Sequence, residues 1–334
     1  MLDSPFIENF LRRRPRRNRQ HPSIRSLVQE TILQPHHLVA PLFVLEGEQR
    51  KEPIKSLPGI FRYSIDLLIQ EVQSLYQLGI RAVDLFCIIS PEKKNGAATE
   101  AIRPDNLLQQ AIRRLKEEVP AMCIIVDIAL DPFTDHGHDG LVNIKGEVDN
   151  DTTLPVLAQM SVLAAEAGAD LVAPSDMMDG RVAYIRAALD QAGQTHVGIL
   201  SYAAKYASSL YGPFREALNS APKFGDKKSY QMDPANIREA LLECTLDDME
   251  GADLLLIKPA LLYLDVIAKV REITFLPLAA YHVSGEYAMV MAAHQQGWLE
   301  ADRVFLESLL SIKRAGADFI LTYAARRVAE QLIY

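Results

Sequence analysis

The chain of 334 residues is 49% apolar and 23% charged, and its 35 basic and 43 acidic residues give a formal net charge of −8. This composition excludes a disordered or fibrous protein and allows either two domains or one large barrel. No apolar run reaches the ~18 residues of a membrane span, and Met1 to Phe10 is too polar for the core of a signal peptide, so we expect a cytoplasmic protein without membrane contact.

The basic residues are concentrated at the start of the chain. Residues 1–35 carry seven arginines and three acidic residues, a net charge of +4, which leaves −12 for the rest. Such an arm is suited either to nucleic acid or to the acidic body of a neighbouring subunit. Since no aromatic residue lies among the arginines to stack on bases, we expect no nucleic-acid partner. The arginines are Arg12, Arg13, Arg14, Arg16, Arg17, Arg19 and Arg25.

A helical segment that ends on glycine and is followed by a short apolar run occurs four times, around Gly79, Gly168, Gly251 and Gly316. Glycine ends helices because it adopts the left-handed conformation. The apolar runs are too short for helices and do not alternate, which is typical of strands covered on both faces. The pattern therefore predicts a parallel sheet with helices on its faces.

Counting all such runs gives eight predicted strands. Helical stretches separate them, for example 65–78, 106–118 and 153–167. Eight such units predict a (β/α)₈ TIM barrel over residues 36–334, with residues 1–35 as an extended N-terminal arm. The alternative is an open doubly wound sheet, but no glycine-rich nucleotide-binding motif follows a strand. The predicted strands are 38–44, 82–86, 122–128, 171–173, 198–201, 254–257, 276–281 and 319–321.

The residues that follow these strands are rich in chemistry, and in barrels catalysis occurs where strands end. Lys258 directly follows the run LLLI, and Lys205 follows the preceding strand. A buried lysine beside a second cation loses its proton more easily, and the neutral amine attacks carbonyl carbon. The alternative is that Lys258 reaches solvent and Lys205 lies on a helix surface.

Two further segments carry candidate residues. Residues 127–140 hold four aspartates and two histidines, which suits a hard cation such as Mg²⁺, although a solvated acidic loop explains them equally well. Residues 211–231 contain glycine, proline and the cations Arg215, Lys223, Lys227 and Lys228. We expect a long mobile loop that closes over a substrate carboxylate. The three cysteines are far apart and form no C-x-x-C motif, so we expect no disulfide.

Several runs together resemble the porphobilinogen synthase (5-aminolaevulinate dehydratase) family from about residue 10 to 334. They are RRRPRRNR, VAPSDMMDGRV, SYAAKYASSLYGPFREA, IKPALLYLDV, AYHVSGEYAM and ESLLSIKRAGADFILTY. The resemblance implies a lyase that condenses two molecules of 5-aminolaevulinate to porphobilinogen with loss of two waters. Each substrate ketone would form a Schiff base with its own lysine, Lys205 or Lys258.

The resemblance also implies two halves of the site. Lys258 would hold the substrate that becomes the propionate side, with Ser284 and Tyr323 at its carboxylate. Lys205 would hold the acetate-side substrate. The other residues on that side would be Asp127, Ser175 and Asp176 near the amine, Arg215 and Lys227 at the carboxylate, and Gln231, Tyr211 and Phe214 closing the pocket.

The metal pattern departs from that of many family members, which carry three zinc-binding cysteines after the third strand. Here Ala129, Asp131 and Asp139 stand in those places, so we expect no catalytic zinc. Asp131 and Asp139 are candidates for Mg²⁺ or for stabilising an ammonium group. A second, allosteric Mg²⁺ site is implied at Glu243, in the run REALLE. Lys227 replaces an arginine that many members have, and a point charge replaces a planar fork.

The family forms octamers in which arms wrap neighbouring barrels, so a homo-octamer is the expected assembly, and the basic arm and acidic body suit it. Two other functions stay open from the sequence: a class I aldolase that uses Lys258 alone, and a nucleic-acid-associated protein that acts through its arm.

Overall fold

The computed structural model describes residues 13–332. The chain forms two compact units, Met1–Ile32 and Leu33–Tyr334. The first twelve residues of the expected arm, Arg12 among them, lie outside the described residues. The described part of the first unit holds a 3₁₀ helix, Pro15–Arg19, and a short helix, α2 (Pro22–Leu27), with a proline at the start of each. Neither helix contains a buried residue in the part that the structure describes.

The second unit is a closed barrel of eight parallel strands. The strands follow one another in chain order around the sheet, and β1 pairs with both β4 and β10, with Leu38 opposite Ile320. This pairing confirms the predicted TIM barrel and shows that the open doubly wound sheet is wrong. The strands are β1 (Leu38–Leu45), β4 (Ala82–Ile88), β5 (Cys123–Ile128), β6 (Leu171–Pro174), β7 (Gly198–Lys205), β8 (Leu254–Lys258), β9 (Leu278–His282) and β10 (Phe319–Thr322).

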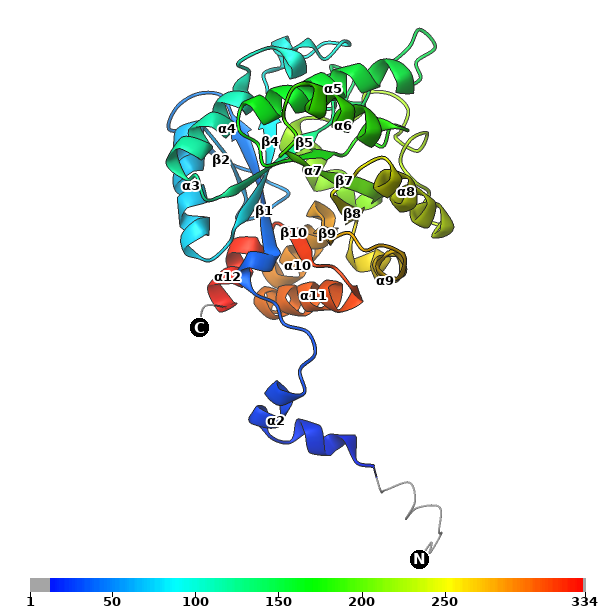
Figure 1. Cartoon of the computed structure of the whole chain (residues 1–334). Helices are drawn as coiled ribbons and strands as arrows, with labels where there is room; N and C mark the ends of the chain where they lie inside the picture. Colours follow the sequence, from blue (N-terminus) through cyan, green and yellow to red (C-terminus); the bar gives the residue numbers. More distant parts are fainter. Residues whose placement is uncertain (1–12, 333–334) are drawn as a thin grey trace, which may run out of the picture. The chain divides into compact units, whose positions relative to one another are not determined.

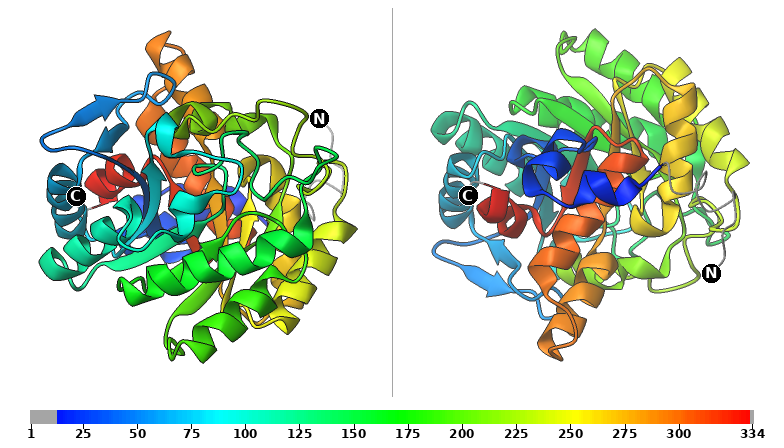
Figure 2. Two further views of the ribbon diagram at one scale, coloured as in Figure 1. Left: turned by 90° about the horizontal axis from the view of Figure 1, so that it is seen from above. Right: turned by 90° about the horizontal axis from the view of Figure 1, so that it is seen from below.

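Helices surround the barrel and cover the outer faces of its strands (Figures 1 and 2). Burial on both faces explains why the strands are continuously apolar; all eight residues of β1 are buried. The covering helices are α3 (Ile65–Gln77), α4 (Leu107–Glu118), α5 (Asn150–Glu166), α6 (Arg181–Gln191), α8 (Arg238–Met249), α9 (Leu264–Ile273), α10 (Ser284–Gln295), α11 (Ala301–Ala315) and α12 (Ala325–Leu332). No helix among residues 13–332 is long and apolar enough to cross a membrane.

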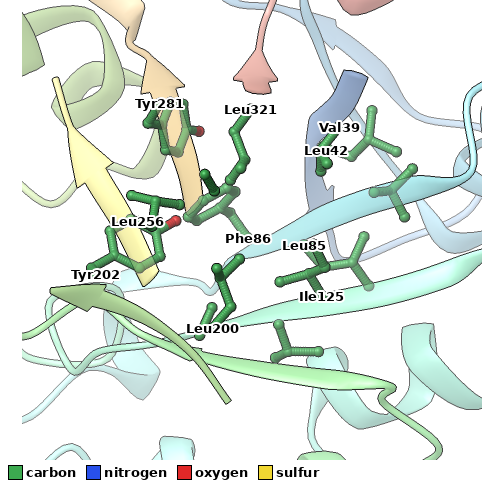
Figure 3. Packing of buried hydrophobic residues seen from close by; sticks show 14 of the residues in the cluster. Val39, Leu42, Leu85, Phe86, Ile125, Leu200, Tyr202, Leu256, Tyr281 and Leu321 are labelled. Atoms are coloured by element: carbon green, nitrogen blue, oxygen red, sulfur yellow. The ribbon is translucent and has the colours of Figure 1, made fainter. Parts of the chain in front are cut away.

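The barrel interior is filled with side chains from almost every strand (Figure 3). Phe86 on β4, Ile125 on β5, Leu200 on β7 and Leu256 on β8 are all at most 2% exposed. Close packing of this kind makes the barrel a solid support rather than a pore. Groups at the carboxyl ends of the strands are therefore held on a rigid base.

The four predicted glycine helix ends are confirmed, since Gly79, Gly168, Gly251 and Gly316 all have positive φ, between 85° and 125°. Gly316 is also held by space: a Cβ there would lie 2.9 Å from the Cβ of Arg271. A side chain at this position would strain both the backbone and the contact with α9. The sequence pattern thus located these helix ends because each requires a left-handed backbone conformation that glycine adopts without strain.

The structure differs from the sequence prediction in three places. A small antiparallel pair, β2 (Lys51–Pro53) and β3 (Phe61–Tyr63), extends the sheet beside β1 and was not predicted. Strand β7 continues to Lys205 through an irregularity after Ser201, so Lys205 lies on a strand and not on a helix surface. Finally, the expected long loop begins with a helix, α7 (Gly212–Leu218), which starts with Gly-Pro and closes on the left-handed Asn219.

Candidate active site

The two lysines lie together at the ends of neighbouring strands. Lys205 ends β7 and Lys258 ends β8, and the two are paired residues in the parallel register. Both are buried, with 6% and 5% exposure. They line one small cavity with other predicted site residues, which are Asp127, Asp131, Asp139, Ser175, Tyr211, Phe214, Arg215, Lys227 and Gln231.

The Nζ of Lys258 is surrounded by aromatic rings. It lies 4.6 Å from the ring centre of Tyr281, 5.0 Å from those of Tyr202 and Phe214, and 5.3 Å from that of Tyr211. The rings come from β7, β9 and the segment around α7, so three parts of the chain build the enclosure. An ammonium group gains some attraction from such rings but loses its water.

This enclosure changes the protonation of Lys258. Burial, and next the positive charge of Lys205, lower the pKa of Lys258 to about 7. At neutral pH a large fraction of the side chain is therefore a free amine, which is the nucleophilic form. Burial likewise raises the pKa of Asp127 to about 7. The site thus holds a base and an acid that both titrate near neutral pH.

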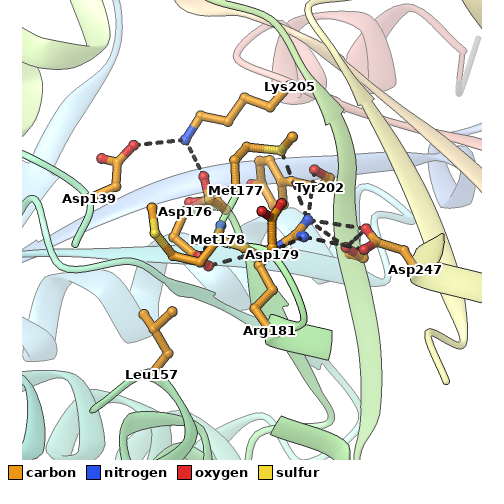
Figure 4. A network of polar contacts seen from close by, with 12 residues as sticks. Asp139, Leu157, Asp176, Met177, Met178, Asp179, Arg181, Tyr202, Lys205 and Asp247 are labelled. Atoms are coloured by element: carbon orange, nitrogen blue, oxygen red, sulfur yellow. Dashed lines mark hydrogen bonds and ion pairs between the residues drawn. The ribbon is translucent and has the colours of Figure 1, made fainter. Parts of the chain in front are cut away.

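Lys205 has polar surroundings instead. Its Nζ donates to the backbone oxygen of Ser175 and lies 3.5 Å from Oδ2 of Asp139 (Figure 4). Ser175 follows β6, so the position of Lys205 depends on two strand ends and the loop after β5. Here the lysine is held by an anion and a carbonyl, whereas Lys258 is held among rings.

A third lysine, Lys227, lies beside the two aspartates near Lys205. Lys227 Nζ lies 2.6 Å from Oδ1 of Asp139 and 3.8 Å from Oδ2 of Asp131. Although burial opposes it, the charges of Lys205 and Lys227 hold the pKa of Asp139 well below its usual range. Burial raises the pKa of Asp131. The two aspartates therefore act as counter-charges for ammonium groups.

Residues 127–140 were interpreted either as a site for a hard cation or as a solvated acidic loop, and burial decides against the second. In this segment only Asp135 is exposed, so a solvated acidic loop is wrong. His138 contacts the backbone oxygen of Phe224 and the hydroxyl of Tyr230, each at 3.1 Å, and so ties this segment to the one after α7. Among residues 13–332 no three His, Cys, Asp or Glu side chains form a group able to hold a metal.

The donor set at the strand ends suits an ammonium group better than a metal. Asp131 and Asp139 already bind Lys227, and Gln231 Nε2 donates to Asp139 at 3.3 Å. A Mg²⁺ ion would compete with two lysines for the same oxygens. These residues therefore do not fit a divalent cation.

The segment after β7 closes the site. Phe214 N donates to Ser284 Oγ at 3.1 Å, and Ser284 Oγ donates to the backbone oxygen of Leu210 at 3.2 Å. Arg215 and Lys227 from this segment line the cavity, whereas Lys223 and Lys228 are exposed. The predicted lid is thus partly helical, and only two of its four cations reach the site.

Four predicted residues lie outside the cavity lining. Ser284 begins α10 beneath Phe214, and the Tyr323 hydroxyl lies 3.1 Å from that of Tyr281. The Asp176 carboxylate faces Arg181 rather than the cavity, at 3.8 Å from Nε, and burial raises its pKa to about 6. Glu243 lies on α8 and borders a separate cavity.

A buried network behind Lys205 was missed by the sequence reasoning. Arg181, 2% exposed, starts α6 and donates to both oxygens of Asp247 on α8, at 3.2 and 3.1 Å (Figure 4). It also donates to Ser201 Oγ at 3.1 Å, and Ser201 donates to Asp247. The network fixes the loop that carries Ser175. The only sequence signal was a charged residue at a helix start after the run SDMMDG.

The cavity beside Glu243 has a volume of about 560 Å³ and a strongly acidic lining. Burial, and then the neighbouring acidic residues, raise the pKa of Glu243 to about 7 even though Arg181 opposes this. Because no three acidic side chains within residues 13–332 form a metal-binding group, a divalent cation here would be held by Glu243 and waters. The acidic lining residues are Glu147, Asp179, Asp226, Glu239 and Glu243.

Comparison with known proteins gives consistent matches. The family model for delta-aminolevulinic acid dehydratase matches residues 12–331. The delta-aminolevulinic acid dehydratase of Chlamydia pneumoniae is 54% identical, over 96% of this chain and 97% of its own length. The chloroplastic enzyme of Physcomitrium patens is 52% identical, over 96% of this chain and 74% of its own length.

A solved structure is similar over nearly the whole chain. The delta-aminolevulinic acid dehydratase (porphobilinogen synthase) of Toxoplasma gondii, in complex with the reaction product porphobilinogen, superimposes with a TM-score of 0.95 at 49% identity. The match covers 97% of this chain and 92% of that one.

Proposed function

The chain belongs to the delta-aminolevulinic acid dehydratase family, and from this premise we propose that it forms porphobilinogen through Schiff bases on both Lys205 and Lys258. The reaction is that of a hydro-lyase: two molecules of 5-aminolaevulinate condense, and two waters leave. The observation that carries the two-lysine proposal is the pairing of Lys205 and Lys258 on adjacent strands around one cavity.

The surroundings of each lysine suggest how the two steps divide. At neutral pH Lys258 supplies a free amine, because burial and Lys205 hold its pKa at about 7. Its attack on a substrate ketone gives a carbinolamine, and loss of water gives the Schiff base. Lys205, held by Asp139 and the Ser175 carbonyl, reacts in the same way with the ketone of the second substrate.

Proton transfers between the substrates need a group that titrates near neutral pH. Asp127 is buried beside both lysines, and its pKa of about 7 lets it accept and return a proton. Arg215 and Lys227 supply positive charge at the Lys205 side for one substrate carboxylate. Ser284 and Tyr323 supply hydroxyl donors at the Lys258 side for the other.

Reductive trapping tests this proposal. Borohydride reduces a Schiff base to a stable amine, so treatment in the presence of 5-aminolaevulinate is expected to label Lys205 and Lys258, read by peptide mass spectrometry. The exposed Lys228 serves as the internal control and should stay unlabelled. Label at Lys258 alone, without a pyrrole product, would point to a class I aldolase instead.

Magnesium is proposed as an activator away from the active site. Glu243 would hold the ion as one carboxylate ligand with waters, which is usual for Mg²⁺, and the ion would supply positive charge to the acidic cavity. Glu243→Gln is expected to reduce Mg²⁺ stimulation several-fold while trapping at the lysines persists. The exposed Glu272→Gln is the matched control, and equal Mg²⁺ responses in both variants would contradict the site.

The assembly is proposed to be a homo-octamer held partly by the N-terminal arm. Leu27 in the arm is 84% exposed, and Ile24 and Val28 are also exposed, so the arm offers apolar surface as well as positive charge. Deleting residues 1–32, the whole first compact unit, is expected to give smaller assemblies in light-scattering mass measurements. An unchanged mass would rule out the arm as an assembly element.

A cytoplasmic location is proposed from the state of the cysteines. Cys87, Cys123 and Cys244 are all free thiols, which suits a reducing compartment. Some related enzymes are named as chloroplastic, so fractionation of the source cells is the direct test.

A further inference from the structure

A buried carboxylate lies inside the barrel below Lys258 and has no place in the reaction described so far. Asp84 is on β4 and is 0% exposed. The hydroxyl of Tyr202 donates to its Oδ2 at 3.1 Å. Within residues 13–332, its second oxygen, Oδ1, has no hydrogen-bond partner. A buried carboxylate with one free oxygen is costly and needs an explanation.

The surroundings of Asp84 identify what it faces. On one side β1 brings only apolar residues, and Pro41 is its partner in the register. The titratable and charged groups come from the other strands. They are Asp127 on β5, Tyr202 on β7, Lys258 on β8, Tyr281 on β9 and Tyr323 after β10. Lys205 and Asp131 in turn influence Lys258.

Tyr202 links Asp84 to the reacting amine. The same ring whose hydroxyl binds Asp84 has its centre 5.0 Å from Lys258 Nζ. Burial, and then Asp127, raise the pKa of Asp84 well above the usual range of a carboxyl. The charge of Asp84 in turn counts among the influences that raise the pKa of Lys258. Asp84 and Lys258 therefore influence each other's protonation in the buried interior of the barrel.

A Schiff base at Lys258 makes a counter-charge necessary. The reactive form is the protonated iminium, a cation surrounded by rings and next to the positive Lys205. Asp127 titrates near neutral pH and serves proton transfers, and Asp131 and Asp139 bind Lys227. We propose that Asp84 is a positioning residue that acts through Lys258, as the buried counter-ion of its ammonium and iminium forms.

The proton balance of this arrangement is simple. When Lys258 becomes a free amine, its proton passes to Asp84, so the pair changes from ammonium and carboxylate to amine and carboxylic acid without a change in net charge. When the iminium forms, Asp84 returns as the carboxylate. The proton so released serves the departing hydroxyl of the carbinolamine, which leaves as water.

The test rests on the proposed Schiff base and follows trapping at each lysine separately. Wild type, Asp84→Asn and Tyr202→Phe are treated with 5-aminolaevulinate and borohydride from about pH 5 to about pH 9. Asparagine keeps the size of Asp84 and still accepts a hydrogen bond from Tyr202. Asp84→Asn removes a negative charge near Lys258. We therefore expect labelling of Lys258 both to rise and to fall at lower pH than in the wild type, by about half a pH unit or more.

Two comparisons separate this role from a structural one. The Lys205 profile should move much less than that of Lys258 in Asp84→Asn, and Tyr202→Phe, which keeps the carboxylate, should give less than half the Asp84→Asn shift. If Asp84→Asn folds poorly by circular dichroism, Asp84→Ala is used with the same expectation. Superimposable Lys258 profiles, or an equal shift in Tyr202→Phe, would overturn the proposal. A wild type unlabelled at Lys258 would instead overturn the proposed function.

Discussion

The two halves of the site carry the same residue type in opposite surroundings. Lys258 lies among four aromatic rings at 4.6 to 5.3 Å, whereas Lys205 contacts a carbonyl and a carboxylate. Adjacent strand ends of one barrel can therefore give two lysine amines different environments. Aromatic rings surround one amine, and charged and polar groups surround the other. The aromatic half favours a free amine at Lys258, and the ionic half holds Lys205 between a backbone carbonyl and a carboxylate.

The largest effect is expected from the aromatic half. Lys258→Met keeps most of the side-chain volume but removes the amine, and we expect porphobilinogen formation to fall by about 10⁴-fold. A colorimetric assay of the pyrrole measures it. Circular dichroism should match the wild type, and trapping at Lys205 should persist. A variant that keeps a tenth of the activity would show that Lys258 is not a nucleophile.

Lys205→Met tests the ionic half. The expected loss of product is about 10³-fold, while Lys258 still forms a trapped adduct, because its enclosure of rings is intact. Removing the Lys205 charge also removes one cause of the lowered pKa of Lys258. The pH at which borohydride labelling of Lys258 rises should therefore be higher than in the wild type. An unchanged pH would contradict electrostatic contact between the halves.

The scaffold behind Lys205 should be more sensitive than an exposed ion pair. Arg181→Met leaves Asp247 and Asp176 buried without their partner and is expected to reduce the free energy of unfolding by about 3 kcal/mol. Arg303→Met, which removes an exposed pair with Glu300, is the control and should cost less than about 1 kcal/mol. Urea denaturation compares the two, and equal costs would show that the buried network is dispensable.

Phe214→Gln is the mildest change to the aromatic half. A polar side chain admits water near Lys258, which relaxes the burial that lowers its pKa, so the pKa rises. The free amine is then lost at higher pH than in the wild type, and the acid limb of kcat/KM should move up by about one pH unit. Phe224→Gln, on the same segment but outside the cavity lining, should leave the limb in place.

Much of the barrel was predictable, because its strands are buried on both faces and its helices end on glycine. The position of Lys258 followed from its place directly after an apolar run. The same reasoning placed Lys205 less well, because β7 continues through an irregularity whose cause lies in pairing with β8. Local pattern alone does not encode such a contact.

The second layer of the site was not predictable in this way. Asp84 lies inside an apolar strand, where its neighbours along the chain give no sign of Tyr202, which is 118 positions away. Arg181 likewise meets Asp247 only because α6 and α8 flank β7. These residues act through partners that the fold brings together, and the sequence reports only that a charged residue stands where an apolar or exposed one is usual.

The aromatic enclosure keeps Lys258 substantially as a free amine at neutral pH while no substrate is bound. Competitive acetylation of the substrate-free protein across pH, with peptide mass spectrometry, measures this directly, with the exposed Lys228 as reference. We predict a labelling midpoint for Lys258 near pH 7. A midpoint near the ordinary lysine value of about 10.4 would contradict it.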